Sequence, residues 1–446
     1  MARESSLPSS VTIRHALRTP SILQILQSSH ILKTSTGDGT LKQSITFPLF
    51  ALLLLSAPAY AGHDDADLSR VRIPALQKGT QVLWKFGKGV VFTNGENKAT
   101  LYGHILQRFD MISGDIAQNT NNFAVKEARI GVKASIAHET KLKLILDGAN
   151  TTSVKDAWIE QRLWHNEDMS LAVRAGQQKP LFGREQTGSS TKREFTDASL
   201  ASGTFSGQRS RGVNLILGAM DKRLHVFAGA FNSTIAKGTR LSGQGEDSSN
   251  TDVKLNFGFG ATLDSDNKGG LSRMSYAAGD LKRSKDLRWS IGAGVWIGNE
   301  GTGVDSQSVS VNLSAVVKTH GIHGMVDAFY RTAEEDGGTA DASAKGFTIQ
   351  GSYVTESMWT FGARYSWVDI DDDAGVNPLI SVKSHSSGGT SLTSNGSASE
   401  ITIMGGKFFN GRKHKVLFDF TFQNVDPDSG SSVDNLLLKV SHLIVL

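Results

Sequence analysis

Alternation between apolar and polar residues is the feature of this 446-residue sequence that most restricts its fold. In residues 127–136, EARIGVKASI, every second residue from Ala128 to Ile136 is apolar, whereas Glu127, Arg129 and Lys133 occupy the other parity. Because successive side chains of a β-strand point to opposite faces, this segment has one apolar and one charged face. The pattern recurs in many segments along the chain, which predicts an all-β protein.

Alternation alone does not separate a soluble β-sandwich from a membrane barrel, because a sandwich also buries one face of each strand. Three further features favour the barrel. The segments are roughly 9 to 12 residues long, as tilted membrane strands are, whereas an average soluble strand has about 5 to 6. Aromatic residues such as Trp158, Trp164 and Trp367 lie near segment ends, where interfacial girdles are expected. An N-terminal secretion signal directs the chain outward.

Sixteen alternating segments are expected to form strands. They lie near residues 100–110, 124–136, 140–149, 154–164, 170–178, 211–220, 223–232, 252–264, 286–298, 307–318, 321–332, 345–355, 358–370, 400–409, 414–424 and 434–446. The weaker segment 271–281 is interpreted as a loop, because it alternates poorly and bacterial barrels usually have an even number of strands. Sixteen strands would enclose a water-filled lumen. We therefore expect a transmembrane antiparallel β-barrel of about sixteen strands.

A long polar loop, residues 174–212, separates two of these segments. Only Glu185, Glu194 and Asp197 are acidic in it, against the basic residues Arg174, Lys179, Arg184, Lys192, Arg193, Arg209 and Arg211. A connection longer than about 15 residues without secondary structure is uncommon and is usually functional or disordered. We interpret this one as functional. If it folds into the barrel, it narrows the lumen and places its cations beside the permeating solute.

Strand parity places further charges on the lumen face. The basic ones are Arg108, Arg129, Lys133, Lys141, Lys143, Arg162, Arg174, Lys254, Arg288 and Arg364, and the acidic ones are Glu127, Asp147, Asp156, Glu160, Asp327 and Asp419. Cations in a narrow lumen of low dielectric attract an anion strongly, and arginine offers phosphate a two-pronged donor. The alternative is structural, because arginine–carboxylate pairs also brace barrel walls. The candidate anion pathway comprises Arg129 and Lys133 of the wall and the seven basic residues of the loop.

The first 98 residues are expected to lie outside the barrel. Residues 1–40 are polar and unpatterned, and we interpret them as an N-terminal extension assigned in error. Residues 41–61 have the features of a signal peptide, namely Lys42, a short apolar run and a cleavage pattern that ends at Ala61. Residues 62–98 would form a periplasmic lead-in and residues 99–446 the barrel. Cleavage removes five basic and two acidic residues, so bulk charge no longer supports a nucleic-acid partner.

The loop also carries a family resemblance. Gly176, Lys179, Phe182, Gly183, Glu185, Ser189, Ser190 and Phe195 resemble the G-x-x-K-x-P-F-G-x-E and S-S signature of the phosphate-selective porin O and P family, although here Pro180 directly follows Lys179. Residues 125–132, 346–353 and 361–371 are similar to strands of that family. The resemblance implies a sixteen-stranded, homotrimeric porin in the bacterial outer membrane, surrounded by outer-membrane lipids and lipopolysaccharide, that conducts small anions such as phosphate.

Two other functions stay open on the sequence alone. The chain could be a general, non-selective porin, or the barrel could be the scaffold of an adhesin or an outer-membrane enzyme. An enzyme is less favoured, because the chain has no G-x-S-x-G motif, and Leu142 stands where an H-E-x-x-H zinc motif would need its second histidine. We expect no catalytic residue, no metal site and no cofactor. Single-channel conductance in a planar bilayer would separate a porin from a barrel scaffold.

Overall fold

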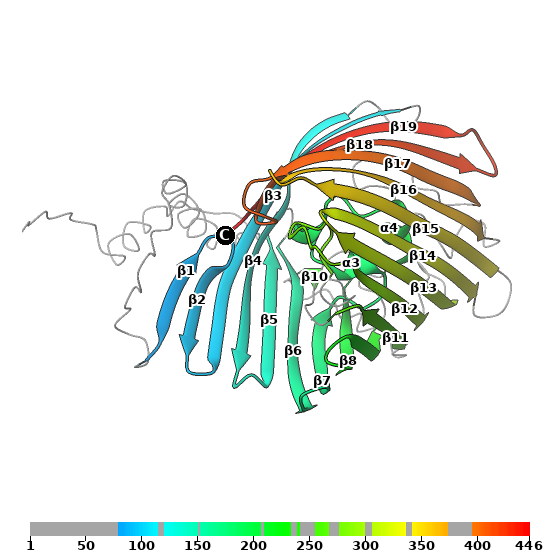
Figure 1. Ribbon diagram of the computed structural model, residues 1–446. Helices are drawn as coiled ribbons and strands as arrows, with labels where there is room; N and C mark the ends of the chain where they lie inside the picture. The colour runs from blue at the N-terminus through cyan, green and yellow to red at the C-terminus, as the bar shows by residue number, and fades with distance from the viewer. Residues whose placement is uncertain are drawn as a thin grey trace, which may run out of the picture. The chain divides into compact units, whose positions relative to one another are not determined.

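Antiparallel strands dominate the structure, a computed structural model that describes residues 79–114, 120–149, 152–206, 209–232, 239–240, 255–266, 276–298, 306–335, 341–372 and 395–446. Within these residues, sixteen strands pair in a ring, which is closed where β19 pairs with β3 (Figure 1). The ring consists of β3 (Asn97–Gly114), β4 (Thr120–Ile136), β5 (Thr140–Asp147), β6 (Ser153–His165), β7 (Ser170–Gln178), β8 (Ser210–Ala219), β9 (Leu224–Asn232), β11 (Leu255–Asp264), β12 (Arg288–Gly298), β13 (Ser306–Thr319), β14 (Ile322–Glu335), β15 (Asp341–Val354), β16 (Trp359–Asp372), β17 (Gly396–Phe408), β18 (His414–Pro427) and β19 (Val433–Val445). The predicted sixteen-stranded barrel is confirmed.

Burial along the strands is the reverse of that in a soluble protein. Leu313 and Ile403 are 59 % and 61 % exposed, whereas their neighbours Asn312 and Thr402 are fully buried. An apolar face that points outward is stable only when lipid covers it, and a closed ring satisfies every backbone hydrogen bond within the membrane. Among the described residues, no helix is long and apolar enough to span a membrane.

A hairpin precedes the barrel. It consists of β1 (Gln81–Lys85) and β2 (Gly89–Asn94), and β2 pairs with the first residues of β3, while β19 pairs with the remainder of that strand. Alternation predicts no strand here, because Val90, Val91 and Phe92 are consecutive apolar residues. A further short strand, β10 (Thr239–Arg240), pairs with the start of β6.

Short turns join the strands at one end of the barrel. They occupy residues 137–139, 166–169, 220–223, 320–321, 355–358 and 409–413. In outer-membrane barrels the end with short turns faces the periplasm. The connection between β11 and β12, residues 265–287, leaves from the same end but is much longer. Within it, residues 276–281 form no strand, as expected, and residues 271–275 lie outside the described part of the chain.

Candidate solute pathway

The constriction loop, residues 179–209, joins β7 to β8, and its described residues 179–206 and 209 lie inside the barrel (Figure 1). It contains α3 (Arg184–Thr187), the 3₁₀ turn η3 (Ser190–Lys192) and α4 (Leu200–Phe205). Helix α4 packs on β14, β15 and β16, and Phe205 stacks on Phe329 of β14 with ring centroids 5.3 Å apart. The prediction that this loop folds into the lumen is confirmed.

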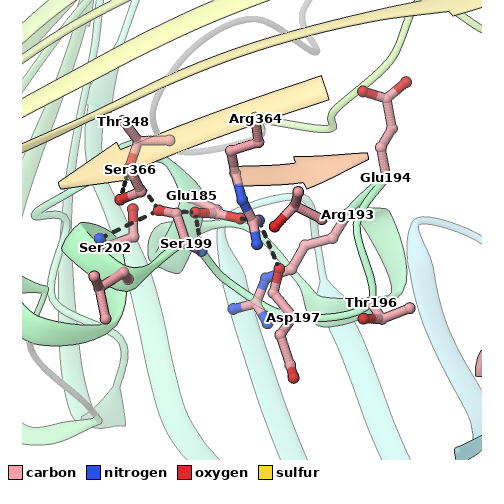
Figure 2. A network of polar contacts seen from close by, with 12 residues as sticks. Glu185, Arg193, Glu194, Thr196, Asp197, Ser199, Ser202, Thr348, Arg364 and Ser366 are labelled. Atoms are coloured by element: carbon pink, nitrogen blue, oxygen red, sulfur yellow. Dashed lines mark hydrogen bonds and ion pairs between the residues drawn. The ribbon is translucent and has the colours of Figure 1, made fainter. Parts of the chain in front are cut away.

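Arg364 of β16 is the centre of the contacts that hold the loop to the wall (Figure 2). Its guanidinium donates to the carbonyl oxygen of Asp197 at 3.0 Å and lies 4.5 Å from the ring centroid of Phe195. It also lies 3.3 Å and 3.6 Å from the carboxylates of Glu400 and Glu185. All three charged side chains are buried. Since buried charges persist only when they are paired, this cluster ties the loop to β16 and β17.

Polar side chains of the wall also satisfy backbone groups of the loop. The amide of Thr196 donates to the carboxylate of Asp419 at 2.7 Å, and the amide of Ala201 donates to the hydroxyl of Ser366 at 3.0 Å. Each contact replaces a hydrogen bond that the wall residue would otherwise make to water. The constriction loop is therefore held against the polar lumen face of β16 and β18 by these hydrogen bonds.

A second inner element, here termed the strap (residues 276–287), reaches the constriction loop from the periplasmic end. The amide of Ala278 donates to the carbonyl oxygen of Lys192 at 3.1 Å. Arg412, in the turn between β17 and β18, donates to the carbonyl oxygens of Ala278 at 2.5 Å and Gly279 at 2.8 Å. Strand alternation gives no indication of this element, but the unusual length of the 265–287 connection among short turns could have pointed to it.

His323 of β14 joins the strap, the wall and the constriction loop. Its Nε2 is hydrogen-bonded to the hydroxyl of Tyr276 in the strap at 2.8 Å, and its Nδ1 lies 3.0 Å from the carboxylate of Glu194 in the loop. The hydroxyl of Ser352 donates to the same carboxylate at 2.7 Å. Burial acts to raise the pKa of Glu194, but His323, Ser352 and Lys318 together bring that pKa below its ordinary value. Glu194 therefore stays ionised and keeps the loop attached at this junction.

Loosening the strap should alter the pore. Replacing Arg412 with alanine leaves two strap carbonyl oxygens without their donor, which costs about 1–3 kcal/mol for each buried group that stays unsatisfied. We expect a larger and noisier single-channel current than in the wild type. Lys413→Ala is the matched control, because the neighbouring Lys413 contacts the carbonyl oxygen of Phe86 rather than the strap. Equal conductance in the Arg412 variant and the wild type would show that the strap does not limit the pore.

The lumen face is covered unevenly by these two inner elements. On the wall that they contact, inward side chains such as Asp327, Thr348 and Thr402 are fully buried. On β5 and β7 the inward cations keep contact with solvent, since the side chains of Lys143 and Arg174 are 26 % and 20 % exposed. Among the described residues, the more open part of the lumen face therefore lies along β4–β7.

Eight of the nine residues in the predicted pathway belong to this side. They are Arg129, Lys133, Arg174, Lys179, Lys192, Arg193, Arg209 and Arg211, which come from β4, β7, β8 and the constriction loop. Some are paired with carboxylates of the wall: the shortest distances are 2.8 Å for Arg129–Asp147, 2.5 Å for Arg174–Glu160 and 2.6 Å for Arg209–Asp156. These pairs brace the wall of the barrel.

Lys179 is enclosed by the backbone of its own loop. Its ammonium donates to the carbonyl oxygens of Gln186 at 2.7 Å and Gly188 at 2.6 Å. Burial, followed by the charges of Arg209 and Arg193, lowers the pKa of Lys179 well below its ordinary value. Lys179 therefore shapes the loop from within.

Arg184 lies apart from the other eight residues. Its side chain is fully buried, its Nε donates to the hydroxyl of Ser314 at 3.2 Å, and its backbone amide donates to Asp327 at 2.9 Å. Burial lowers the pKa of Arg184. The buried side chain of Arg184 therefore cannot contact a solute in the lumen.

Lys155 is a cation of the open wall that alternation misses. The register between β5 and β6 shifts between Ile145 and Leu146, so that Lys155 is the extra residue of a β-bulge. Its ammonium lies 3.8 Å from the lumen-facing Asp147, and its side chain is 23 % exposed. A bulge breaks the alternation of faces, and the sequence carries no signal for its position.

Trp158 faces the lumen and not the membrane interface. The guanidinium of Arg174 lies 4.4 Å from the centroid of its ring, and the same guanidinium pairs with Glu160, two residues further along β6. The intervening Ile159 is 56 % exposed on the outer face. The expectation that Trp158 belongs to an interfacial girdle is therefore wrong, because Trp158 lies in the middle of β6 and has the same parity as the buried Asp156 and Glu160.

Comparison with known proteins identifies the family. The family model described as phosphate-selective porin O and P matches residues 101–388, which is more than half of the chain. The chain belongs to this family. It is an outer-membrane porin, a channel rather than an enzyme, and the resemblance in the constriction loop is confirmed.

Three solved structures of bacterial outer-membrane proteins are similar to this chain in fold. The outer-membrane channel DcaP of Acinetobacter baumannii matches with a TM-score of 0.52 and 13 % identity over 79 % of this chain and 99 % of its own. An anion-selective porin from Comamonas acidovorans matches with a TM-score of 0.51 and 12 % identity over 78 % of this chain and 100 % of its own. OmpT of Vibrio cholerae matches with a TM-score of 0.50 and 10 % identity over 79 % and 99 %. No curated protein sequence matches the chain.

Proposed function

We propose that this porin prefers anions, with phosphate among its solutes, and that they pass along the β4–β7 wall. The observation that carries the proposal is a group of three lysines at the open lumen: Lys133 of β4, Lys143 of β5 and Lys192 of the constriction loop. Lys133 and Lys143 are direct partners in the register of the two strands. Burial and then the charges of Arg412 and Lys143 lower the pKa of Lys192, which means that these cations are close enough to repel one another.

Like charges that face one another across two strands destabilise a sheet unless an opposite charge compensates them. Lys143 is paired with Asp156 at 2.5 Å. Lys133 has no such partner, because no carboxylate among the described residues lies within ion-pair distance of its ammonium. The ammonium lies instead over the ring of Tyr102, 4.5 Å from the ring centroid. A solute anion would relieve this repulsion, whereas a solute cation would increase it.

Block of chloride current by phosphate tests the phosphate part of the proposal. We expect added phosphate to reduce the small-ion current of the wild type in a planar bilayer. Replacing Lys133 and Lys192 with glutamine should raise the half-blocking phosphate concentration about tenfold, the effect of losing ~1.4 kcal/mol of binding. Lys85→Gln with Lys88→Gln is the control, because both lysines are exposed in the β1–β2 hairpin. Absence of phosphate block in the wild type would favour a general, non-selective porin.

The assembly proposed for this porin is a homotrimer in a bilayer of outer-membrane lipids and lipopolysaccharide. The belt of exposed apolar side chains around the barrel, which includes Leu313 and Ile403, supports a lipid environment. Native mass spectrometry in detergent should give three times the mass of one mature chain. A monomer under conditions that preserve channel activity would contradict the trimer.

The processing proposed for the precursor is cleavage after Ala61. Residues 1–40 would not be translated, residues 41–61 would be the signal peptide, and residues 62–98 would be the periplasmic lead-in of a mature chain whose barrel spans residues 99–446. N-terminal sequencing of the porin from outer membranes should begin at Gly62. A mature protein that retains residues before Leu41 would contradict this proposal.

A further inference from the structure

Two aromatic rings lie on the same open wall as the lysine group. Tyr102 of β3 carries the ammonium of Lys133 over its ring, 4.5 Å from the centroid. Trp158 of β6 has the ammonium of Lys143 at 6.0 Å from its centroid and the guanidinium of Arg174 at 4.4 Å. The lumen wall therefore alternates between flat apolar surfaces and cations, from β3 to β7.

The strand register places a glycine beside each ring. Gly131 is the partner of Tyr102, and a Cβ atom at Gly131 would lie only 2.8 Å from Cζ of the tyrosine ring. Gly176 is the partner of Trp158, and it has a φ of 117° and no room for a Cβ, which would lie 2.3 Å from the carbonyl oxygen of Ala157. Because both partner positions are glycines, they place no side chain over the rings, and both aromatic residues are half-buried and not fully buried.

This wall presents aromatic rings as well as cations, and an inorganic anion has no use for the rings. An inorganic anion needs only the cations. It gains little from the face of an aromatic ring, because that face carries a negative electrostatic potential. An organic anion with a ring gains twice, because its charged group reaches Lys133 and Lys143 while its ring packs on the phenol or indole. The two lysines are register partners, and the two rings lie on either side of them.

We propose that Tyr102, Trp158, Lys133 and Lys143 form a subsite for organic anions that carry a flat ring, of which benzoate is the simplest. This inference rests on the proposed anion preference of the pore and names a solute class within it. Acetate presents the same carboxylate without the ring and is the natural comparison.

The test is block of the chloride current by benzoate and by acetate in planar bilayers. In the wild type, benzoate should block at a concentration roughly two- to tenfold lower than acetate, the range that a ring-to-ring contact gives. Trp158→Leu should remove most of this difference. Trp164→Leu is the matched control, because Trp164 lies on the same strand and is exposed. Equal block by the two anions in the wild type, or an undiminished difference in Trp158→Leu, would overturn the subsite.

A second pair of variants keeps the test independent of the folding of the tryptophan variant. The hydroxyl of Tyr102 has no hydrogen-bond partner among the described residues, so Tyr102→Phe keeps everything that the subsite uses. Tyr102→Phe should retain the preference for benzoate and Tyr102→Leu should reduce it. Equal benzoate preference in both variants would exclude the phenol ring from the subsite. The zero-current potential in a potassium chloride gradient reports anion preference separately, so failure of the subsite is distinguishable from failure of the proposed function.

Discussion

Replacing both Lys133 and Lys192 with glutamate is expected to change the preference of the porin from anions to cations. Each replacement alters the local charge by two units, at positions that face the open lumen beside β4 and β5. At an effective dielectric of about 20, a unit charge 4 Å from an ion contributes ~4 kcal/mol, so the altered pathway should repel anions. The ratio of chloride to potassium permeability should fall by a factor of ten or more, which corresponds to at least ~1.4 kcal/mol.

The measurement is the zero-current potential of single channels in a potassium chloride gradient. Lys85→Glu with Lys88→Glu carries the same change in total charge on exposed hairpin residues, and should leave the potential almost unchanged. If the hairpin variant shifts the potential as far as the lumen variant, net charge and not the β4–β7 wall sets the preference. If neither variant shifts it, the lysine group is not on the pathway.

Removing the Arg364 side chain should release the constriction loop. Arg364→Leu leaves the buried carboxylates of Glu185 and Glu400 without their shared cation, and breaking a buried ion pair in this way costs about 3–5 kcal/mol. The hydrogen bond to the carbonyl oxygen of Asp197 is lost as well. We expect a lower melting temperature and a larger single-channel conductance, because the loop leaves its seat on β16.

A conservative variant separates charge from geometry at this site. Arg364→Lys keeps the positive charge but has no planar fork with which to reach two carboxylates and a carbonyl oxygen at once. It should lie between the wild type and Arg364→Leu in both melting temperature and conductance. Wild-type conductance in a folded Arg364→Leu barrel would show that α4 and the strap hold the loop without the Arg364 cluster.

The wall of this porin is predictable from its sequence because the membrane imposes a strict physical rule on it. Each crossing must show lipid one face and water the other, so alternation locates the strands and assigns Arg129 and Lys133 to the lumen face. The cationic loop is predictable for a related reason, since so many charges between two membrane strands have nowhere to lie except in water or in the lumen.

The errors and omissions arise where alternation stops being the governing rule. Lys155 is displaced by a β-bulge, and the face that Trp158 occupies follows from its parity and not from the presence of other aromatic residues near the strand end. Arg184 and Lys179 depend on how the loop folds back on itself and on the wall, which no periodic pattern encodes. The strap depends on contacts between residues far apart in sequence, such as Arg412 with Ala278.

The zero-current potential of the wild-type porin in a potassium chloride gradient is the most direct test of an anion-preferring pathway along β4–β7. The purified protein should form discrete channels whose zero-current potential lies toward the chloride equilibrium value. A potential toward the potassium value would contradict the assignment of Lys133, Lys143 and Lys192 as the group that sets the preference.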